Sequence, residues 1–409
     1  MPSFSIALSG LQADSVALNT IGNNLANLNT TAYKKHSTAF EDLFYQQIGT
    51  SGSGDAKQVG VGTKVSSTST SYLQGGLSPT GNSTDMALSG NGFFVVNQSG
   101  VQALTRAGNF KLDQSGNLTT VDGAQVMGYP AVNGITQAGG VLSPISIPIG
   151  VNESAEATSN FSVAANLNAA SAVGTSFTTP VAMYDSLGKS HAATVTYTKA
   201  STNSWNYAIA LPAGDATGTP ANNVGTLTFD GSGKLASPTG SVAGITFPGM
   251  ANGASDLQMK WNLYDSTGNS MLTQSTSASS ATASSQNGYA SGEYQSFAVD
   301  ATGVVTAAFS NGHTEAIAQL AIATVTNLQG LTAAGNNNFL ATAVSGSPSL
   351  GVAGAGGRGM VEDSTLEQSN VDISTEFSDL IVAQRSFEAN SKTVTTFDTI
   401  TQDTISMIR

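Results

Sequence analysis

The residues that most often carry out chemistry in proteins are scarce and scattered in this chain. Its 409 residues include no cysteine and only three histidines, His36, His191 and His313, which lie far apart and form no HExxH pattern. Thiol catalysis, disulfides and thiolate metal sites are therefore excluded. The Gly-x-Ser-x-Gly nucleophile elbow is also absent. We expect no catalytic residue, no cofactor and no metal site.

One stretch matches a nucleotide-binding motif by letter. Gly354, Gly356 and Gly359 have the GxGxxG spacing of a dinucleotide-binding loop. That loop needs a strong strand before it and an acidic residue placed to bind the ribose in a βαβ unit, and the sequence offers neither. In a chain with 45 glycines, we interpret the Gly-rich segment 346–359 as a linker.

An Asp-x-x-Gly pattern recurs beside alternating apolar residues. A calcium loop would need further oxygen ligands at its third, fifth and twelfth positions, and these are missing. Asp at the first and Gly at the fourth position is the preferred chemistry of a type I turn. The repeats therefore predict hairpins and antiparallel β structure. The copies span residues 113–116, 185–188, 230–233, 265–268 and 300–303.

Composition excludes several classes of protein. Charged residues make up only 10% of the chain, and the formal net charge is −12. Scattered basic residues in an acidic chain do not build the basic surface that nucleic acid or an anionic membrane would bind. No run of 18 apolar residues is present, so we expect no membrane insertion. The first basic residue is Lys34, so the N-terminus does not resemble a cleaved secretory signal.

Amphipathic helices are predicted only at the two ends, over residues 3–28 and 372–409. Ser3 is the expected N-cap of the first, and Asp372 or Ser374 that of the second. Apolar residues recur in both at the seven-residue spacing of a narrow coiled-coil seam. The predicted seam residues, which are also the candidate assembly interface, are Phe4, Leu8, Leu11, Leu18, Ile21, Leu25, Leu28, Phe377, Leu380, Phe387, Val394, Phe397, Ile405 and Ile408.

The sequence between the helices is polar and β-like. Gly/Ser and Ser/Thr runs predict an extended linker over residues 36–70. A first β domain is expected from residues 71–150 with 289–365, and a second from residues 151–288, inserted into the first. The expected fold class is α+β and mostly β: a terminal coiled coil from residues 1–35 and 366–409, plus two antiparallel β-rich domains, one inserted in the other.

The terminal helices face a common physical problem. Burying a Leu or Phe side chain contributes roughly 1.5–3 kcal/mol, whereas an isolated helix is only marginally stable in water. Each helix could simply dock on its own domain. The more economical solution pairs the two helices and buries the remaining apolar surface against neighbouring copies of the chain. Repetition of such a head-to-tail interface produces a helical polymer.

Three parts of the chain resemble the rod and hook family of bacterial flagellar axial proteins. They are residues 11–35, residues 366–392, and the β segments at 93–96 and 105–130. Ala32 stands where the family usually has Gly, which would permit a positive φ. With Ala we expect a right-handed conformation there, or a bend carried by Thr31. The residues matched to the family motifs are Asn24, Asn27, Thr31, Tyr33, Lys34, Asn370, Val371, Asp372, Gln384 and Arg385.

The resemblance also implies a function. The chain's length and inserted domain favour the hook branch, whose members form a flexible tube that transmits torque from rod to filament. The implied location is extracellular, on the flagellum, after export without a cleaved signal peptide. Implied partners are copies of the chain itself, a distal rod protein, a hook-cap protein, a hook–filament junction protein and the flagellar export apparatus. A distal-rod or other hook–basal-body protein is the alternative, and a β-rich surface adhesin a remote one.

Overall fold

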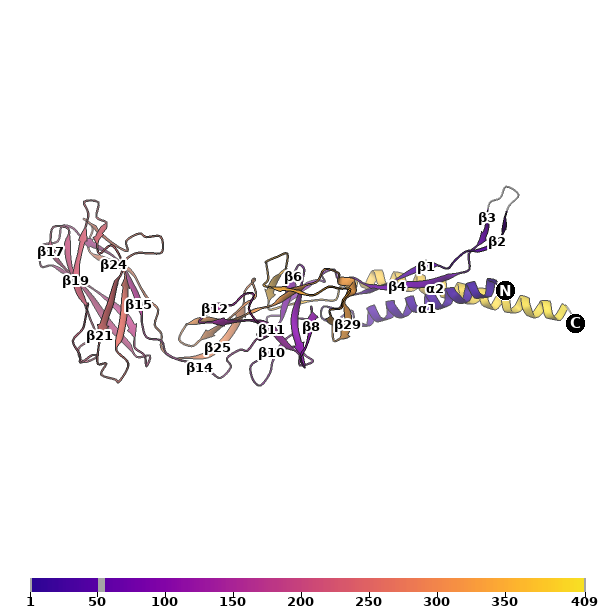
Figure 1. Ribbon diagram of the computed structural model, residues 1–409, viewed down its shortest axis with the longest axis horizontal. Coiled ribbons are helices and arrows are strands. Elements are labelled where there is room, and N and C mark those ends of the chain that lie inside the picture. Colours follow the sequence, from indigo (N-terminus) through magenta and orange to yellow (C-terminus); the bar gives the residue numbers. More distant parts are fainter. Residues whose placement is uncertain (1, 51–55, 408–409) are drawn as a thin grey trace. The chain divides into compact units, whose positions relative to one another are not determined.

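The computed structural model describes residues 2–50 and 56–407 (Figure 1). A helix lies at each end, α1 (Pro2–Ala26) and α2 (Ile373–Met407), and between them strands dominate, with one short 3-10 helix, η1 (Leu328–Gly330). The predicted fold class, mostly β with terminal helices, is confirmed. The chain forms two compact units. Unit 1 comprises Met1–Pro148, Phe297–Ala307 and Glu315–Arg409, and unit 2 comprises Ile149–Ser296 and Ala308–Thr314.

The β part of unit 1 is built around one sheet. Its hydrogen-bonded neighbours follow the order β27-β11-β7-β8-β30-β29, and Phe93, Leu104, Tyr129 and Phe339 lie in its core. The strands of this region are β5 (Leu77–Pro79), β6 (Met86–Ser89), β7 (Phe93–Gln98), β8 (Val101–Thr105), β9 (Lys111–Leu112), β10 (Leu118–Thr119), β11 (Gln125–Val132), β12 (Ile135–Thr136), β13 (Ser143–Pro144), β26 (Val304–Phe309), β27 (Thr314–Leu320), β28 (Ile322–Thr324), β29 (Thr332–Gly335), β30 (Asn338–Leu340), β31 (Ser349–Gly351), β32 (Met360–Asp363) and β33 (Thr365–Glu367).

Unit 2 is a sandwich of two sheets around an aromatic core. Trp205, Trp261, Tyr197 and Phe161 are buried between the sheets. One sheet has the order β21-β22-β15-β23 with β24 beside β15, and the other β16-β17-β18-β19-β20. The strands of the sandwich are β15 (Asn160–Asn168), β16 (Ser176–Tyr184), β17 (Ser190–Ser201), β18 (Ser204–Ala210), β19 (Val224–Phe229), β20 (Leu235–Ser237), β21 (Val242–Phe247), β22 (Leu257–Asn262), β23 (Leu272–Ser275) and β24 (Ser280–Gln286). Strands β14 (Asn152–Glu153) and β25 (Gly292–Val299) pair with each other outside it.

One sheet of unit 2 is mixed rather than purely antiparallel. Strand β15 runs parallel to β22 and β23, and antiparallel to β24. Turn motifs predict only hairpins, that is, antiparallel neighbours in sequence. Strands β15 and β22 are joined through the whole opposite sheet, and so long a connection leaves no local signal of parallel pairing.

All five Asp-x-x-Gly repeats form the same turn. Each Asp carboxylate accepts the N–H groups two and four residues later, and each Gly N–H donates to the Asp carbonyl. The two carboxylate bonds of Asp265 measure 2.9 and 2.8 Å. The glycines adopt φ between 79° and 83°, a left-handed conformation that favours Gly. The predicted turns are confirmed, but the turn at 265–268 does not join antiparallel strands, because β22 and β23 on either side of it both run parallel to β15.

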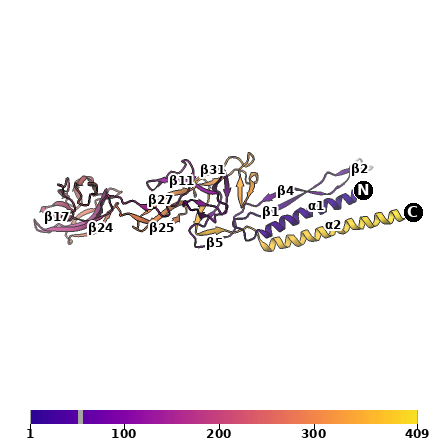
Figure 2. The ribbon, with the colours of Figure 1, turned by 90° about the horizontal axis from the view of Figure 1, so that it is seen from below.

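Residues 36–70 are paired strands, so the prediction of an extended linker was wrong. Strand β1 (His36–Asp42) pairs antiparallel with β4 (Thr63–Thr70), and β2 (Gln46–Thr50) with β3 (Ala56–Val59). The β1–β4 ladder lies along α1 (Figure 2), where the Thr38 hydroxyl donates to the Thr20 hydroxyl at 3.1 Å. Ser and Thr suit strands as well as linkers, so composition alone does not reveal a partner strand within the same segment.

Candidate assembly interface

The two terminal helices begin differently from each other. Helix α2 is capped as predicted, since the Asp372 carboxylate accepts the Thr375 N–H at 2.7 Å. Helix α1 already begins at Pro2, so Ser3 lies inside the helix and the prediction of Ser3 as N-cap was wrong. Proline suits a first helical position because its missing N–H would have no partner there.

Helices α1 and α2 lie side by side and antiparallel (Figures 1 and 2). At one end Asn24 Nδ2 donates to Glu376 Oε2 at 3.0 Å. Two heptads further along, Asn390 packs against Gly10, where an added Cβ would lie 2.6 Å from Asn390 Nδ2. Ala17 and Ala383 are both buried between these contacts. The seam is therefore built from small and polar residues that allow the helices to approach closely.

The large apolar residues predicted for the seam lie beside it. Leu11, Leu18 and Leu25 each follow a seam residue by one position, which turns them roughly 100° around the helix. Within the described residues, none of the predicted set is buried, and Phe4, Leu8, Phe377 and Ile405 are 44%, 43%, 49% and 62% exposed. Ile408 lies outside the described residues. The chain thus pairs its helices through a small-residue seam and leaves their apolar faces open.

Other large apolar side chains of this region are also exposed. In the helices they are Val16, Ile373, Ile381, Val382, Ile400 and Met407, and on the β1–β4 and β2–β3 segment they are Phe40, Phe44, Tyr45, Ile48 and Val59. Exposed apolar side chains in such number are typical of sites of protein association. None of the helices in the described ranges is long and apolar enough to cross a membrane.

A buried charge cluster joins the helix pair to the β part of unit 1. Lys34 Nζ lies 2.6 Å from Glu367 Oε1, and Arg106 Nη1 lies 3.4 Å from Glu367 Oε2. Glu367 Oε1 also accepts the Gly75 N–H at 2.9 Å. Burial lowers the pKa of Lys34, and the Glu367 carboxylate acts in the opposite direction. The chain leaving α1 and the chain entering α2 are thus tied together by one carboxylate.

Two asparagines complete this junction. The buried Asn24 side chain accepts the His36 N–H at 2.9 Å and donates to the His36 carbonyl at 2.8 Å. Asn370 Oδ1 accepts the Lys35 N–H at 2.7 Å, and its Nδ2 donates to the Ser71 carbonyl at 2.8 Å. Backbone groups that emerge from the helix therefore find partners in side chains from both ends of the sequence.

Ala32 carries the bend after α1 in a left-handed conformation, with φ of 56°. The expectation of a right-handed Ala32, or of a bend carried by Thr31, was therefore wrong. The Ala32 N–H donates to the Glu367 carbonyl at 2.8 Å, and the residue is 1% exposed. Surrounding contacts hold the residue in a conformation that costs an L-residue roughly 1–2 kcal/mol.

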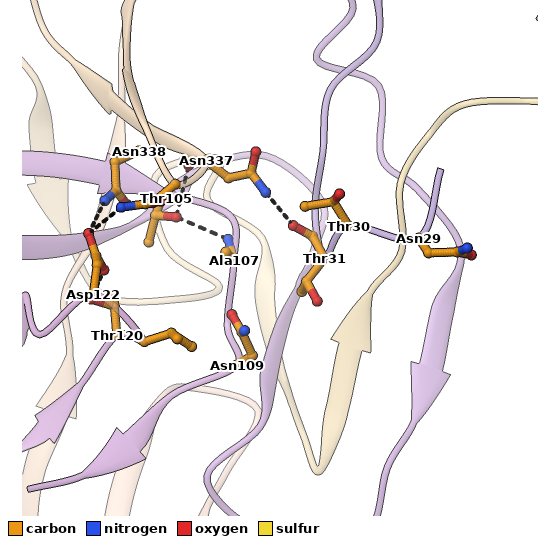
Figure 3. Close-up of a pocket in the computed structure, with 12 residues that line it drawn as sticks. Asn29, Thr30, Thr31, Thr105, Ala107, Asn109, Thr120, Asp122, Asn337 and Asn338 are labelled. Carbon is orange, nitrogen blue, oxygen red and sulfur yellow. Dashed lines mark hydrogen bonds between the residues drawn. The ribbon is translucent and has the colours of Figure 1, made fainter. Parts of the chain in front are cut away.

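A polar cleft of about 620 Å³ lies beside this bend (Figure 3). On one wall Asn337 Nδ2 donates to the Thr31 carbonyl at 2.8 Å. On another, Asp122 accepts hydrogen bonds from Asn338 at 3.1 Å and from Thr120. Burial would raise the pKa of Asp122, but these hydrogen bonds hold it below its ordinary value. The cleft shows how the β29–β30 hairpin anchors the loop that follows α1.

Comparisons with known proteins cover the chain from end to end. Four family models match: flagella basal body rod protein over residues 4–34, flagellar hook protein FlgE/F/G D1 domain over 87–166, flagellar basal body protein FlaE D2 domain over 152–289, and flagellar basal body rod FlgEFG protein C-terminal over 362–407. The chain is 31% identical to flagellar hook protein FlgE of Treponema pallidum, with 100% of both chains covered. It is 34% identical to that of Salmonella typhimurium, over 97% of this chain and 98% of the relative.

The chain belongs to the flagellar hook protein family.

A solved structure agrees at the level of the fold. The crystal structure of Helicobacter pylori flagellar hook protein FlgE2 matches with a TM-score of 0.55 at 17% identity, and covers 71% of this chain and 100% of that one. The family consists of structural proteins of the flagellar hook, and it is not known for enzymes. The resemblance seen in the terminal motifs is therefore confirmed over the full chain.

The hook-family motif residues fall into two groups. Tyr33, Lys34 and Val371 are buried at the junction together with Asn24, and Asn27, Thr31, Asn370 and Asp372 make hydrogen bonds around it. Gln384 and Arg385 are exposed on α2. Sequence reasoning missed Glu367, Glu376 and Arg106 as junction residues. The available signal was their position inside the matched stretches, in a chain where charged side chains are rare.

The residues considered for chemistry have local roles in this hook-family chain. His36 contacts Thr70, His191 lies between Asp185 and Asp215, and His313 contacts Glu153. The segment Gly354–Gly359 is a turn, closed by the Gly354 N–H on the Gly359 carbonyl at 3.0 Å. In the part of the chain that the structure describes, no group of three or more His, Asp or Glu is arranged to hold a metal ion.

Proposed function

We propose that this chain is the structural subunit of the flagellar hook and assembles with copies of itself into a flexible helical tube that transmits torque from rod to filament. One observation carries the proposal. The terminal helices already have each other as partners, yet their large apolar side chains remain open. A second copy of the chain is the partner that family membership supports.

The energetics favour assembly through these faces. Phe4, Leu8, Phe377 and Ile405 each keep about half of their surface in water. Covering those four side chains contributes on the order of 5 kcal/mol, and the half-buried residues of the same faces add to it. A copy that repeats the contact head to tail builds a tube rather than a closed dimer.

In this proposal the helices and the β domains occupy different layers of the tube. The helices from residues 1–35 and 366–409 would form the inner tube. The β domain of residues 71–150 with 289–365, and the inserted domain of residues 151–288, would form outer layers. A surface with only 10% charged residues offers weak, interchangeable contacts, because few ion pairs fix one arrangement. Such layers can slide past one another as the tube bends.

Other partners belong to the same proposal. A hook must contact a distal rod protein at its base, and a hook-cap protein and a hook–filament junction protein at its growing end. Location outside the cell requires passage through the flagellar export apparatus. We propose that this occurs without a cleaved signal peptide, since the first basic residue is Lys34.

Electron microscopy of concentrated, purified protein tests the proposal. The unmodified chain should form tubes. Leu8→Lys and Phe377→Lys each place a charge in an apolar face and should abolish tubes while helical circular dichroism is retained. The matched control is Thr393→Lys on the exposed surface of α2, roughly 160° around the helix from Phe377, which should polymerise normally. Normal tubes from both face variants would contradict the proposal.

A further inference from the structure

The α1–α2 seam has one feature that packing alone does not require. Two heptads separate Gly10 from Asn24 on α1, and two separate Glu376 from Asn390 on α2. Asn24 bonds Glu376 at 3.0 Å, and Asn390 lies against Gly10 and bonds Asp14 at 2.9 Å. The two polar contacts are therefore in the same antiparallel register, with Ala17 and Ala383 level between them.

This arrangement discriminates between registers. Glu376 is 3% exposed and Asn24 is 1% exposed. Asn24 also bonds His36, and Glu376 Oε1 lies 3.7 Å from Lys35 Nζ, so the hydrogen bond that depends on register is the one from the Asn24 amide to Glu376 Oε2. Sliding α2 by one heptad in one direction would place Glu376 against Ala17. Sliding it the other way would place Asn24 against Ala383 and move Glu376 beyond the end of α1. Either slip breaks both polar contacts and takes the buried Glu376 carboxylate away from the Asn24 amide that bonds it.

An apolar seam would not discriminate in this way. Ala17 and Ala383 pack equally well against any small residue one heptad away. The open faces carry Leu, Phe and Ile at a similar spacing, and these would also accept α2 if α1 turned by about one residue. Polar residues at a helix seam are known to specify register at some cost in stability.

We propose that Gly10, Asn24, Glu376 and Asn390 are the register residues of the helix pair. They hold α1 and α2 in one alignment and thereby keep the apolar faces directed outward. This inference rests on the proposed function in one respect only, namely that the outward faces serve assembly. The register residues are positioning residues, because they act through the faces whose direction they set.

Distances within one chain test the proposal independently of assembly. The chain has no cysteine, so Ser15→Cys and Lys392→Cys, both at exposed positions, accept spin labels selectively. The labelled full chain is diluted into unlabelled chain, so that only intrachain distances contribute. We expect a single narrow distance peak. Replacing the polar pair by Asn24→Leu with Glu376→Leu should add a second distance peak, from chains in which α2 has slid by one heptad, about 10 Å along the helix axis.

A second variant keeps the test decisive. Asp14→Ala with Asn390→Ala removes the other polar contact without adding bulk, and it should also add a second distance peak from chains slid by one heptad. The matched control, Asn19→Leu with Glu388→Leu, makes the same chemical changes as the first variant on exposed helix surface and should keep one peak.

Three outcomes would overturn the inference. They are a broad distribution in the unmodified chain, a single unshifted peak in both variants, or loss of helical circular dichroism in both. The last would assign these residues to stability rather than register. Tube formation is scored separately, so failure of the unmodified chain to polymerise contradicts the proposed function and leaves the register result intact.

Discussion

At the scale of single residues, Ala32 carries the sharpest disagreement between sequence and structure. Its φ of 56° lies in the left-handed region, which the usual Gly of the family adopts at little cost. The strain is tolerated because the Ala32 N–H bonds the Glu367 carbonyl, and Lys34, two residues on, bonds the carboxylate of the same residue. The preference of Ala for negative φ is therefore overridden at this position by buried hydrogen bonds to Glu367, which cannot be predicted from the residues next to Ala32 in the sequence.

Ala32→Gly should stabilise the junction. Gly relieves a left-handed conformation, and we expect a gain of about 0.5–1 kcal/mol, whereas Ala32→Val should lose at least about 2 kcal/mol because a β-branched side chain tolerates this region poorly. Hydrogen exchange of the residue 32 amide reports the local free energy. Faster exchange in Ala32→Gly would contradict the left-handed assignment.

The buried Lys34–Glu367 pair should be far more sensitive than a surface pair. Lys34→Met leaves Glu367 with only Arg106, at 3.4 Å, as a charged partner, and should destabilise unit 1 by about 3–5 kcal/mol. Both α-helices belong to unit 1 and both tryptophans to unit 2, so helical circular dichroism in urea follows unit 1 selectively.

The matched control for this prediction is Lys64→Met. Lys64 pairs with Glu41 at 2.7 Å, but the two side chains are 55% and 43% exposed. Its loss should cost less than about 1 kcal/mol because water screens the pair. Equal effects of the two substitutions would show that burial does not set the strength of the junction.

At the scale of elements, local signals were sufficient where a local interaction decides the structure. The Asp-x-x-Gly turns were predictable because the Asp carboxylate bonds N–H groups only two and four residues away. The terminal helices were predictable from heptad spacing. Which face of each helix meets the other was not, because Gly10 and Ala17 are less conspicuous than Leu11 and Leu18 and their role depends on residues more than 350 positions away.

The β1–β4 ladder and the parallel strands of unit 2 were missed for a related reason. In the sequence, β2 and β3 lie between β1 and its partner β4. All the strands of the other sheet lie between β15 and its partner β22. No spacing rule within a short window records such contacts. Only one residue of the buried charge cluster was predicted, because the family motif indicated Lys34. Glu367, which pairs with Lys34, and Arg106, which pairs with Glu367, lie far from it in the sequence.

The hairpin turns predict a pH dependence for unit 2. The Ser232 hydroxyl and the Lys234 N–H hold the pKa of Asp230 below its ordinary value, and the Thr267 hydroxyl and the Asn269 N–H do so for Asp265. A folded pKa below the unfolded one means that the stabilisation is present above the unfolded pKa and is lost as pH falls through the folded pKa.

Urea unfolding followed by tryptophan fluorescence should therefore show unit 2 losing stability as pH falls below about 4. Asp230→Asn with Asp265→Asn keeps an acceptor oxygen but cannot titrate, so its pH profile should be flatter. Asp256→Asn, outside these turns, is the matched control and should follow the unmodified protein. Identical profiles for all three proteins would show that the turns do not contribute.

At the scale of the whole molecule, the chain separates two physical tasks. Its helices carry apolar side chains that remain open in a single copy, and only 10% of the residues of the whole chain are charged. The first property favours cohesion between copies, and the second favours movement between layers. Under the proposed function both properties serve one purpose, namely a joint that holds together while it bends.

An electron cryo-microscopy map of the assembled polymer tests this account most directly. The account predicts that α1 and α2 remain paired in the innermost layer through Gly10, Ala17 and Asn24, and that Leu8 and Phe377 are buried against neighbouring copies. Tubes in which these two side chains face solvent, or in which contacts between the β units alone hold the copies together, would contradict it.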